Sequence, residues 1–399
     1  MAESKFTSAE LELSRSNVLR KLQMPALGAG GIALALSFVG AIVWPKEFFQ
    51  AWLVAYFYWL AMALGSTALL MMQYISGGRW GAVIRRPLEA GASNVPLMAL
   101  FFVPMAFGLQ YLYPWAQPDI VATSAVLQFK SQHYLYPAFF LARAAVYFVV
   151  WIFISNRLVA WSRESDTKGW GEAQASRIST ISHAGIILWA LTMSLAAIDW
   201  GMSLEVAWFS HIYGLMFAAA QILTALTLAV IVTAYMADHR PISTVISSDR
   251  FHDLGKLLLA FTMVWTYFQL SQYIIIWGAN LPEEVEWYNI RNEGGWEFLT
   301  VFLFLFHFVV PFSLLLSQSR KKKPMSIAAV AGLLCVMRYV DIFWWITPTF
   351  SNSFFFHPMH LTTVVGIGGI WMWRYIGTLA AHPLLAVHEP VIESELEHA

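Results

Sequence analysis

The chain of 399 residues is far more apolar than a soluble globular domain. Hydrophobic residues make up 58% of it and charged residues 12%, with a mean hydropathy of +0.59 and a formal net charge of zero. Soluble domains carry about 25% charged residues, so the composition excludes a soluble enzyme and indicates an integral membrane protein. A nucleic-acid partner is not expected.

About ten apolar runs are long enough to cross the bilayer as helices, because roughly 20 apolar residues span its hydrocarbon core. In chain order they are residues 26–44, 48–74, 95–113, 135–158, 178–198, 212–234, 254–277, 298–316, 327–346 and 361–379. The first is expected to be a retained helix, because it lacks the cleavage pattern of a signal peptide. The predicted fold is an all-α membrane domain over residues 26–380, with polar tails at 1–25 and 381–399.

Basic residues are divided very unevenly between the two sets of loops. The two tails and the loops after spans two, four, six and eight hold seventeen Lys and Arg residues, and the other loops hold three. The larger set is Lys5, Arg15, Arg20, Lys21, Arg79, Arg85, Arg86, Arg157, Arg163, Lys168, Arg177, Arg240, Arg250, Arg320, Lys321, Lys322 and Lys323, and the smaller is Lys46, Lys130 and Arg291. Short basic loops stay in the cytoplasm, so both termini are predicted to be cytoplasmic.

Many aromatic residues fall near the expected span ends. Rings at such positions commonly sit at the headgroup level of the bilayer, and an anchoring role is the prediction here. The residues concerned are Trp44, Tyr113, Trp115, Trp200, Trp208, Trp277, Trp287 and Trp296.

The chain offers few ligands for a redox centre. Cys335 is the only cysteine, which excludes an internal disulfide, an all-cysteine iron–sulfur cluster and a CxxCH haem attachment. The candidate haem-ligating histidines are His183, His211, His307 and His360, and only His211 and His360 are expected at a matching depth. A satisfied buried histidine or a proton relay therefore fits these residues better than haem ligation.

Ionisable residues inside the expected spans are the most informative feature of the sequence. One such group at the bilayer centre costs about 2.5–3.5 kcal/mol, so each needs a partner, a hydrated cavity or a function. Together they form a candidate proton path, with Arg143 as a further charged group towards the outer face. The path comprises Glu89, His183, Asp253 and Lys256 near the cytoplasmic side, His307 and Arg338 near the middle, and Asp199, His211 and Asp341 towards the outer side.

Two pairs within this set leave alternatives open. Arg338 and Asp341, like Asp253 and Lys256, are three residues apart and share a helix face, so they can neutralise each other as structural pairs. Equally, they can line a hydrated path in which a carboxylate exchanges protons. Asp199 with His211 offers a third possibility, a quinone head-group site. A secondary transporter is disfavoured, because glycines and prolines are not paired between the two halves of the chain.

The loop ANLPEEVEWYNIRNEGGWEF, between spans seven and eight, is acidic and aromatic. It is expected on the outer side, either as a solvated loop or as a docking surface for other subunits.

Four segments carry a family resemblance. RWGAVIRRPLEA after span two, AAIDWGMSLEVAWFSHIYGLMF across spans five and six, the stretch from LGKLLLAF to NLPEEVEWY, and MRYVDIFWW in span nine resemble the second polysulfide-reductase-like (NrfD-like) membrane subunit of bacterial alternative complex III. That complex is a quinol:cytochrome c oxidoreductase.

The resemblance implies two four-helix bundles, spans two to five and six to nine, with the first and tenth helices peripheral. It implies a subunit that is not catalytic alone, gives structural support, and forms part of a proton-translocation path in the bacterial inner membrane. The chain itself would bind no haem or metal, although bound phospholipids are expected. Haem c and iron–sulfur clusters would lie in partner subunits, with quinol as the substrate of the complex. The implied partners are the NrfD-like sister membrane subunit, multihaem and monohaem cytochrome c subunits, an iron–sulfur subunit, small membrane subunits and, in some assemblies, a terminal oxidase.

Overall fold

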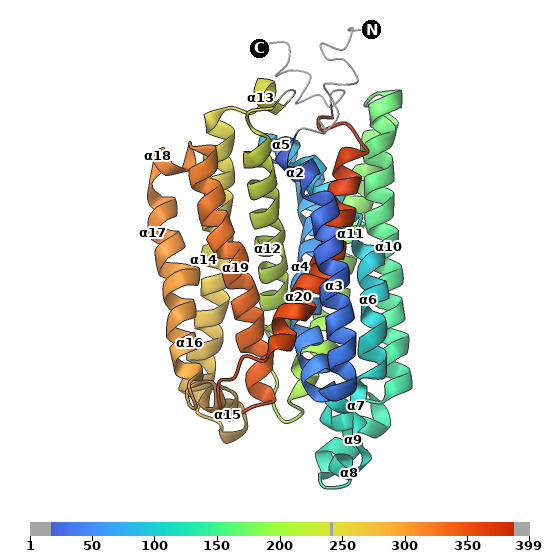
Figure 1. Ribbon diagram of the computed structural model, residues 1–399, viewed down its shortest axis with the longest axis vertical. Coiled ribbons are helices and arrows are strands. Elements are labelled where there is room, and N and C mark those ends of the chain that lie inside the picture. The colour runs from blue at the N-terminus through green and yellow to red at the C-terminus, as the bar shows by residue number, and fades with distance from the viewer. Residues whose placement is uncertain (1–16, 240–241, 387–399) are drawn as a thin grey trace.

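The computed structural model describes residues 17–239 and 242–386. These residues form a bundle of long, roughly parallel helices (Figure 1), and no strand occurs among them. The long helices are α3 (Gln23–Val43), α4 (Pro45–Ser76), α10 (Pro137–Lys168), α11 (Glu172–Trp200), α12 (Tyr213–Met236), α14 (Ser248–Ala279), α19 (Pro324–Ile346) and α20 (Pro358–Ala380). The prediction of an all-α, multi-pass membrane protein is confirmed.

Two further crossing segments are composite. Helices α5 (Arg79–Ala92) and α6 (Val95–Phe107) follow each other directly, and α16 (Trp296–Leu303) continues through a π-helical turn, η3 (Phe304–Val309), into α17 (Val310–Leu316). Within the described residues, nine segments are long and apolar enough to cross a membrane. Helix α20 has 23 residues, slightly more than the 21 of Trp296–Leu316, but it is not among these nine segments.

Short helices cap the bundle at both ends. The end that carries the loops after α4, α10, α12 and α17 is called the basic end below, and Figure 1 shows it uppermost. It holds α2 (Val18–Lys21), α13 (Ile242–Val245) and α18 (Gln318–Lys321). The opposite end holds α7 (Leu109–Leu112), η1 (Pro114–Ala116), α8 (Pro118–Val121), α9 (Ala125–His133), η2 (Met202–Leu204), α15 (Pro282–Arg291) and η4 (Thr347–Thr349).

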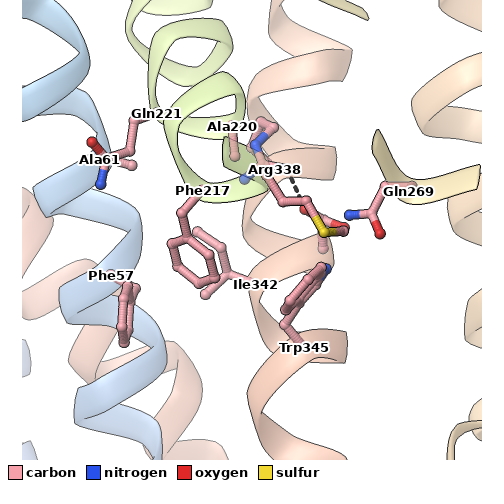
Figure 2. Close-up of a pocket in the computed structure, with 11 residues that line it drawn as sticks. Phe57, Ala61, Phe217, Ala220, Gln221, Gln269, Arg338, Ile342 and Trp345 are labelled. Atoms are coloured by element: carbon pink, nitrogen blue, oxygen red, sulfur yellow. Dashed lines mark hydrogen bonds and ion pairs between the residues drawn. The ribbon is translucent and has the colours of Figure 1, made fainter. Parts of the chain in front are cut away.

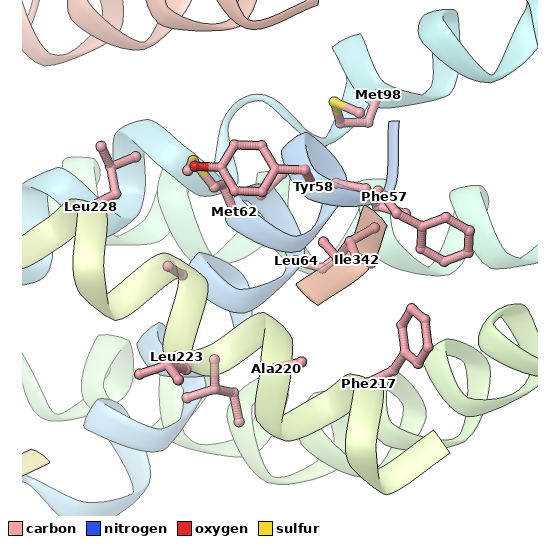
Figure 3. Packing of buried hydrophobic residues seen from close by; sticks show 14 of the residues in the cluster. Phe57, Tyr58, Met62, Leu64, Met98, Phe217, Ala220, Leu223, Leu228 and Ile342 are labelled. Atoms are coloured by element: carbon pink, nitrogen blue, oxygen red, sulfur yellow. The ribbon is translucent and has the colours of Figure 1, made fainter. Parts of the chain in front are cut away.

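Helices α4 and α12 form the centre of the molecule. Both are apolar on all sides and almost completely buried, as expected for a helix surrounded by other helices. They meet through Phe57 and Phe217, whose ring centroids are 5.2 Å apart (Figure 3). Their backbones also approach closely at Gly65, where an added Cβ would lie 2.0 Å from the Gln221 carbonyl oxygen. A small residue at this position therefore sets the distance between the two helices.

The remaining helices pack around this pair. Helix α4 contacts α6 and α11, and α10 packs on α11 and α6, while α12 contacts α14 and α19, with α17 packed on α14. Helices α3 and α20 lie against each other, joined by Gly30 and Gly369, and α20 also contacts α4.

The third span begins earlier than the hydropathy predicts. The predicted start is residue 95, but the crossing segment runs from Trp80 to Phe107 and includes Arg85, Arg86 and Glu89. These charged side chains are buried and paired with one another. Hydropathy counts each charge separately, so it cannot register this mutual neutralisation.

The anchoring prediction is wrong for most of the aromatic residues. Trp44 and Trp277 are exposed, as an anchor requires. The other six are at most 4% exposed and pack inside the chain: Tyr113, Trp115, Trp200, Trp208, Trp287 and Trp296. The end of the bundle opposite the basic end is thus packed with aromatic rings, as in the stacked pair Trp208 and Trp287, whose centroids are 4.9 Å apart.

Candidate functional site

Buried ionisable residues gather in three clusters on different helices. They are called the Glu89 cluster, the Asp199 cluster and the Asp341 cluster, after the carboxylate at the centre of each. The first lies on α5 and α10 towards the basic end, the second at the opposite end of α10 and α11, and the third on α12, α14 and α19.

In the Glu89 cluster, one carboxylate receives several donors. Arg86 Nη1 lies 2.7 Å from Glu89 Oε2, Arg85 Nε lies 3.3 Å from Oε1, and the Ser162 hydroxyl donates to the same Oε1. The arginines are three and four residues before Glu89, so one helix face carries all three. Arg86 also pairs with Asp166 of α10. These contacts fasten α5 to α10 and leave Glu89 no free acceptor position facing solvent.

In the Asp199 cluster, the carboxylate is fully buried and held from three directions. Arg143 donates to both oxygens, from Nε at 2.8 Å and Nη2 at 2.9 Å, and the Tyr147 hydroxyl donates at 2.8 Å. The Arg143 guanidinium lies 3.9 Å from the centroid of the Tyr134 ring. Burial and the Asp199 charge raise the pKa of Tyr134 to about 12. The bidentate geometry makes this a strong link between α10 and α11.

The Asp341 cluster joins three helices. Arg338 pairs with Asp341 one turn along α19 and donates from Nε to Thr224 Oγ1 of α12 at 3.2 Å. Trp265 of α14 donates from Nε1 to Asp341 Oδ2 at 3.3 Å. The sequence spacing predicts the Arg338–Asp341 pair, but not the acceptor Thr224 and the donor Trp265 that other helices supply.

His307 lies next to this cluster without a hydrogen bond of its own. Its side chain is fully buried, and its ring centroid is 3.8 Å from that of Trp265. Neither ring nitrogen has a hydrogen-bond partner among the described residues. His307 belongs to the π-helical turn η3, which widens the helix by one residue. Such π-turns often occur at functional sites, and a buried polar group without a partner is costly.

A small cavity separates the Asp341 cluster from α4. It has a volume of about 20 Å³ and is lined by Gln221, Gln269, Arg338 and Asp341 among mainly apolar residues (Figure 2). Figure 2 shows Gln269 pointing from α14 towards Arg338. A water molecule needs about 10–15 Å³ and two or more polar partners, so one water fits here. The buried Gln221 Oε1 has no other partner among the described residues.

A much larger groove lies on the other side of Asp341 and Gln269. It encloses about 470 Å³ between α14, α15, α16, η3 and α19. Its outer wall includes Tyr267, 65% exposed, and Phe304, 56% exposed, so the groove opens on the apolar outside of the bundle. The volume is typical of a small-molecule site, and its mainly apolar lining includes the polar side chains of Gln269, Asn292 and Asp341.

The structure brings together only part of the predicted proton path. Arg338, Asp341 and His307 meet around Trp265, whereas Glu89 and Asp199 each belong to a separate, satisfied cluster.

The other four predicted path residues face outward, which corrects their placement inside the bundle. His183 is exposed and its Nδ1 lies 2.8 Å from the Ser179 carbonyl on the same helix, while His211 is exposed beside the Phe209 ring. Asp253 and Lys256 pair with each other at 3.0 Å, with side chains 39% and 57% exposed. In this chain a path through them would therefore run along its outer face.

Asp199 and His211 do not form a joint site. Asp199 is surrounded by its three donors, and the ring contact of His211 is with Phe209. Among the described residues the structure gives no contact between the two. The predicted quinone head-group site at this pair therefore has no geometric basis.

The burial of Arg291 could not be predicted from the sequence. Arg291 of α15 is fully buried, with Nη1 2.7 Å from the Trp287 carbonyl, Nη2 2.7 Å from the Trp345 carbonyl, and Glu205 3.5 Å away. Burial lowers the pKa of Arg291 to about 10. Thr349 donates to Glu205 at 2.7 Å. No local pattern marks these residues, because they come from three separate loops.

No model of a known protein family matches the chain, and no curated protein sequence matches it significantly.

Proposed function

We propose that this chain is a membrane subunit of a quinol-oxidising respiratory complex of the alternative complex III kind, and that its Asp341 cluster moves protons within the membrane. The observation that carries the proposal is a buried carboxylate beside a water-sized cavity and a buried histidine without a hydrogen bond. Intramembrane ionisable groups are expensive and generally functional. The DWGMSLE and NLPEE segments support the assignment to this kind of complex.

Asp341 is the group best suited to take up and release a proton. Its carboxylate accepts hydrogen bonds from Arg338 and Trp265, and a water in the adjoining cavity would contact it as well. When Asp341 is protonated, Arg338 keeps its bond to Thr224 but loses its counter-ion. The positive charge of Arg338 therefore favours release of the proton from Asp341, while burial favours its uptake. A small change in the hydration of the site can shift the balance between the two.

His307 would serve as the second proton carrier. Neither ring nitrogen has a partner among the described residues, so the unprotonated nitrogen of the neutral ring can accept a proton from a water molecule. The Trp265 ring lies against His307 and also bonds to Asp341, so transfer between the two would pass through water around this ring.

In this proposal the basic end faces the cytoplasm, as its Lys and Arg content favours. The haem and iron–sulfur subunits would bind at the opposite end, where Glu283, Glu286 and Glu293 remain exposed around the buried Trp287 and Arg291. The chain would contribute to the oxidoreductase as one of its subunits and have no redox activity by itself.

A second candidate function, quinone binding, is favoured by the 470 Å³ groove. A quinone head group in this groove would contact Asp341 and Gln269, and its tail would lie along the exposed aromatic residues Tyr267 and Phe304. A carboxylate at the edge of an apolar slot is suited to accept a quinol proton.

Two experiments test these functions. Mass spectrometry of a mild-detergent extract should find multihaem cytochrome and iron–sulfur subunits with this chain, and purification of a stable, active chain alone would refute the subunit assignment. In the assembled complex, Asp341→Asn should abolish proton movement while quinol oxidation continues. The exposed Asp253→Asn serves as the matched control. Loss of quinol binding in Asp341→Asn would favour the second candidate, and unchanged behaviour in both assays would exclude both roles for Asp341.

A further inference from the structure

A third hollow lies at the basic end, next to the Glu89 cluster and away from the other two clusters. It encloses about 630 Å³ between the start of α3, the junction of α5 and α6, the second half of α10 and the end of α20. Its polar lining consists mainly of Gln23, Ser93, Asn156, Arg163, Arg374 and His382. None of these residues belongs to the proposed proton path.

Two arginines give this hollow its charge. Arg163 Nη2 lies 3.4 Å from Ser93 Oγ, and Arg374 Nη2 donates to the Ser93 carbonyl at 3.2 Å. Neither arginine forms an ion pair with a carboxylate of the described residues, whereas nearby Arg86 is paired with both Glu89 and Asp166. Arg163 Nε is buried and has no hydrogen-bond partner in the described part of the chain. Arg163 is near enough to Glu89 and Asp166 to be attracted by them, but among the described residues neither arginine has a directly bonded counter-ion of its own.

His382 adds evidence that the local potential is positive. Burial lowers the pKa of His382, and the charges of Arg163 and Arg86 lower it further. A neutral imidazole can still donate one hydrogen bond to an anion.

The hollow also has an apolar side. Val159 and Ala160 of α10 line it together with Trp373, which is 36% exposed. Along the same helix, Phe153 and Val149 are 56% and 68% exposed. An apolar face of this kind is suited to acyl chains, and a tryptophan beside it is typical of the headgroup level.

We propose that this hollow binds the phosphate head group of an anionic phospholipid, with Arg163 and Arg374 on the phosphate and the acyl chains along the outer face of α10. Arginine pairs bind phosphate oxygens through short, charge-assisted hydrogen bonds, and basic pockets between membrane helices bind anionic head groups. A free phosphate ion would use the same arginines but gain nothing from the apolar face.

The test titrates the delipidated full chain, with any subunits it retains, and counts bound lipid by native mass spectrometry. Phosphatidylglycerol should bind at least about tenfold more tightly than phosphatidylcholine, because only its head group carries a net charge. Arg163→Gln and Arg374→Gln should each weaken phosphatidylglycerol binding about fivefold. Arg374 is exposed, so its variant should fold even if the Arg163 variant does not. Arg177→Gln removes an exposed charge from α11, outside the hollow and off the face assigned to the acyl chains, and should change nothing.

Three results would overturn the proposal. The first is equal affinity for the two lipids or an unchanged Arg374→Gln variant. The second is inorganic phosphate that binds as tightly as phosphatidylglycerol, since the site would then be one for a free anion. The third is lipid binding that occurs only after residues 387–399 are deleted. That segment contains four glutamates, Glu389, Glu393, Glu395 and Glu397, and such a result would make it the occupant.

Discussion

Replacing Asp341 with asparagine should destabilise the protein strongly. The Arg338 and Asp341 side chains are only 2% and 4% exposed, so the variant leaves a buried guanidinium without this counter-ion, although Thr224, at 3.2 Å, remains as a neutral hydrogen-bond partner. Removing one member of a buried ion pair costs about 3–5 kcal/mol, because the other charge stays desolvated. Asparagine can still accept one hydrogen bond, which places the expected loss near the lower limit, at about 3 kcal/mol.

A double-mutant cycle separates the pair energy from other effects. Arg338→Met, Asp341→Asn and the double variant would be unfolded by SDS titration in mixed micelles, and the free energies of unfolding compared with the wild type. The double variant should be more stable than the sum of the single losses implies, with a coupling energy of about 2 kcal/mol.

The chain contains a matched control for this measurement. Asp253 and Lys256 have the same three-residue spacing on a helix, but their side chains are 39% and 57% exposed. Exposed pairs contribute about 0–1 kcal/mol, so Asp253→Asn should have little effect. If Asp341→Asn cost no more than Asp253→Asn, or if the cycle gave no coupling, the reasoning from burial would be refuted.

Three further predictions concern other parts of the molecule. Gly65→Ala should lower the free energy of unfolding by about 1–3 kcal/mol, because its Cβ would lie 2.0 Å from the Gln221 carbonyl oxygen. Gly28→Ala is the control and should be neutral, because its Cβ would meet nothing within 4 Å. Equal effects of the two variants in the same SDS titration would contradict this. His307→Phe should raise stability by about 1 kcal/mol, since it removes two buried nitrogens without partners, and should slow proton movement in the complex; a less stable variant would indicate a hidden hydrogen bond. The pKa of Tyr134 is raised to about 12 in the folded protein, whereas an unfolded tyrosine has a pKa of about 10. The free energy of unfolding should therefore fall as the pH rises above about 10, because there the Tyr134 hydroxyl ionises only in the unfolded chain. Ultraviolet difference titration against Tyr134→Phe would detect its ionisation, and a midpoint near 10 would refute the assignment.

The helix inventory could be predicted because membrane spans need long apolar runs. Each of the ten predicted spans corresponds to a long helix or a composite helical segment, and within the described residues nine of these are long and apolar enough to cross a membrane. The error at the third span has a specific cause. Arg85, Arg86 and Glu89 neutralise each other inside the protein, whereas a hydropathy window treats them as three unfavourable charges.

Contacts between helices could not be predicted in the same way. Arg143 and Asp199 were both recognised as buried charges, but they are 56 residues apart and their bidentate pairing depends on how α10 packs on α11. Trp265 and Thr224 gave no signal at all, because a single indole or hydroxyl in an apolar helix is common. The sequence FLFHFV also contains no feature that predicts the π-helical turn in which His307 is buried.

The sequence by itself determined that this is an all-α, multi-pass membrane protein, and it identified most of the costly ionisable residues. Only the tertiary structure decided which of them are internal. His183 and Lys256 face outward, while His307 and Asp341 face the interior. The physical reason is that lipid and protein interior are similarly apolar, so a membrane helix carries little periodicity to mark its buried face. The direction of each charged side chain then follows from the partners that neighbouring helices supply.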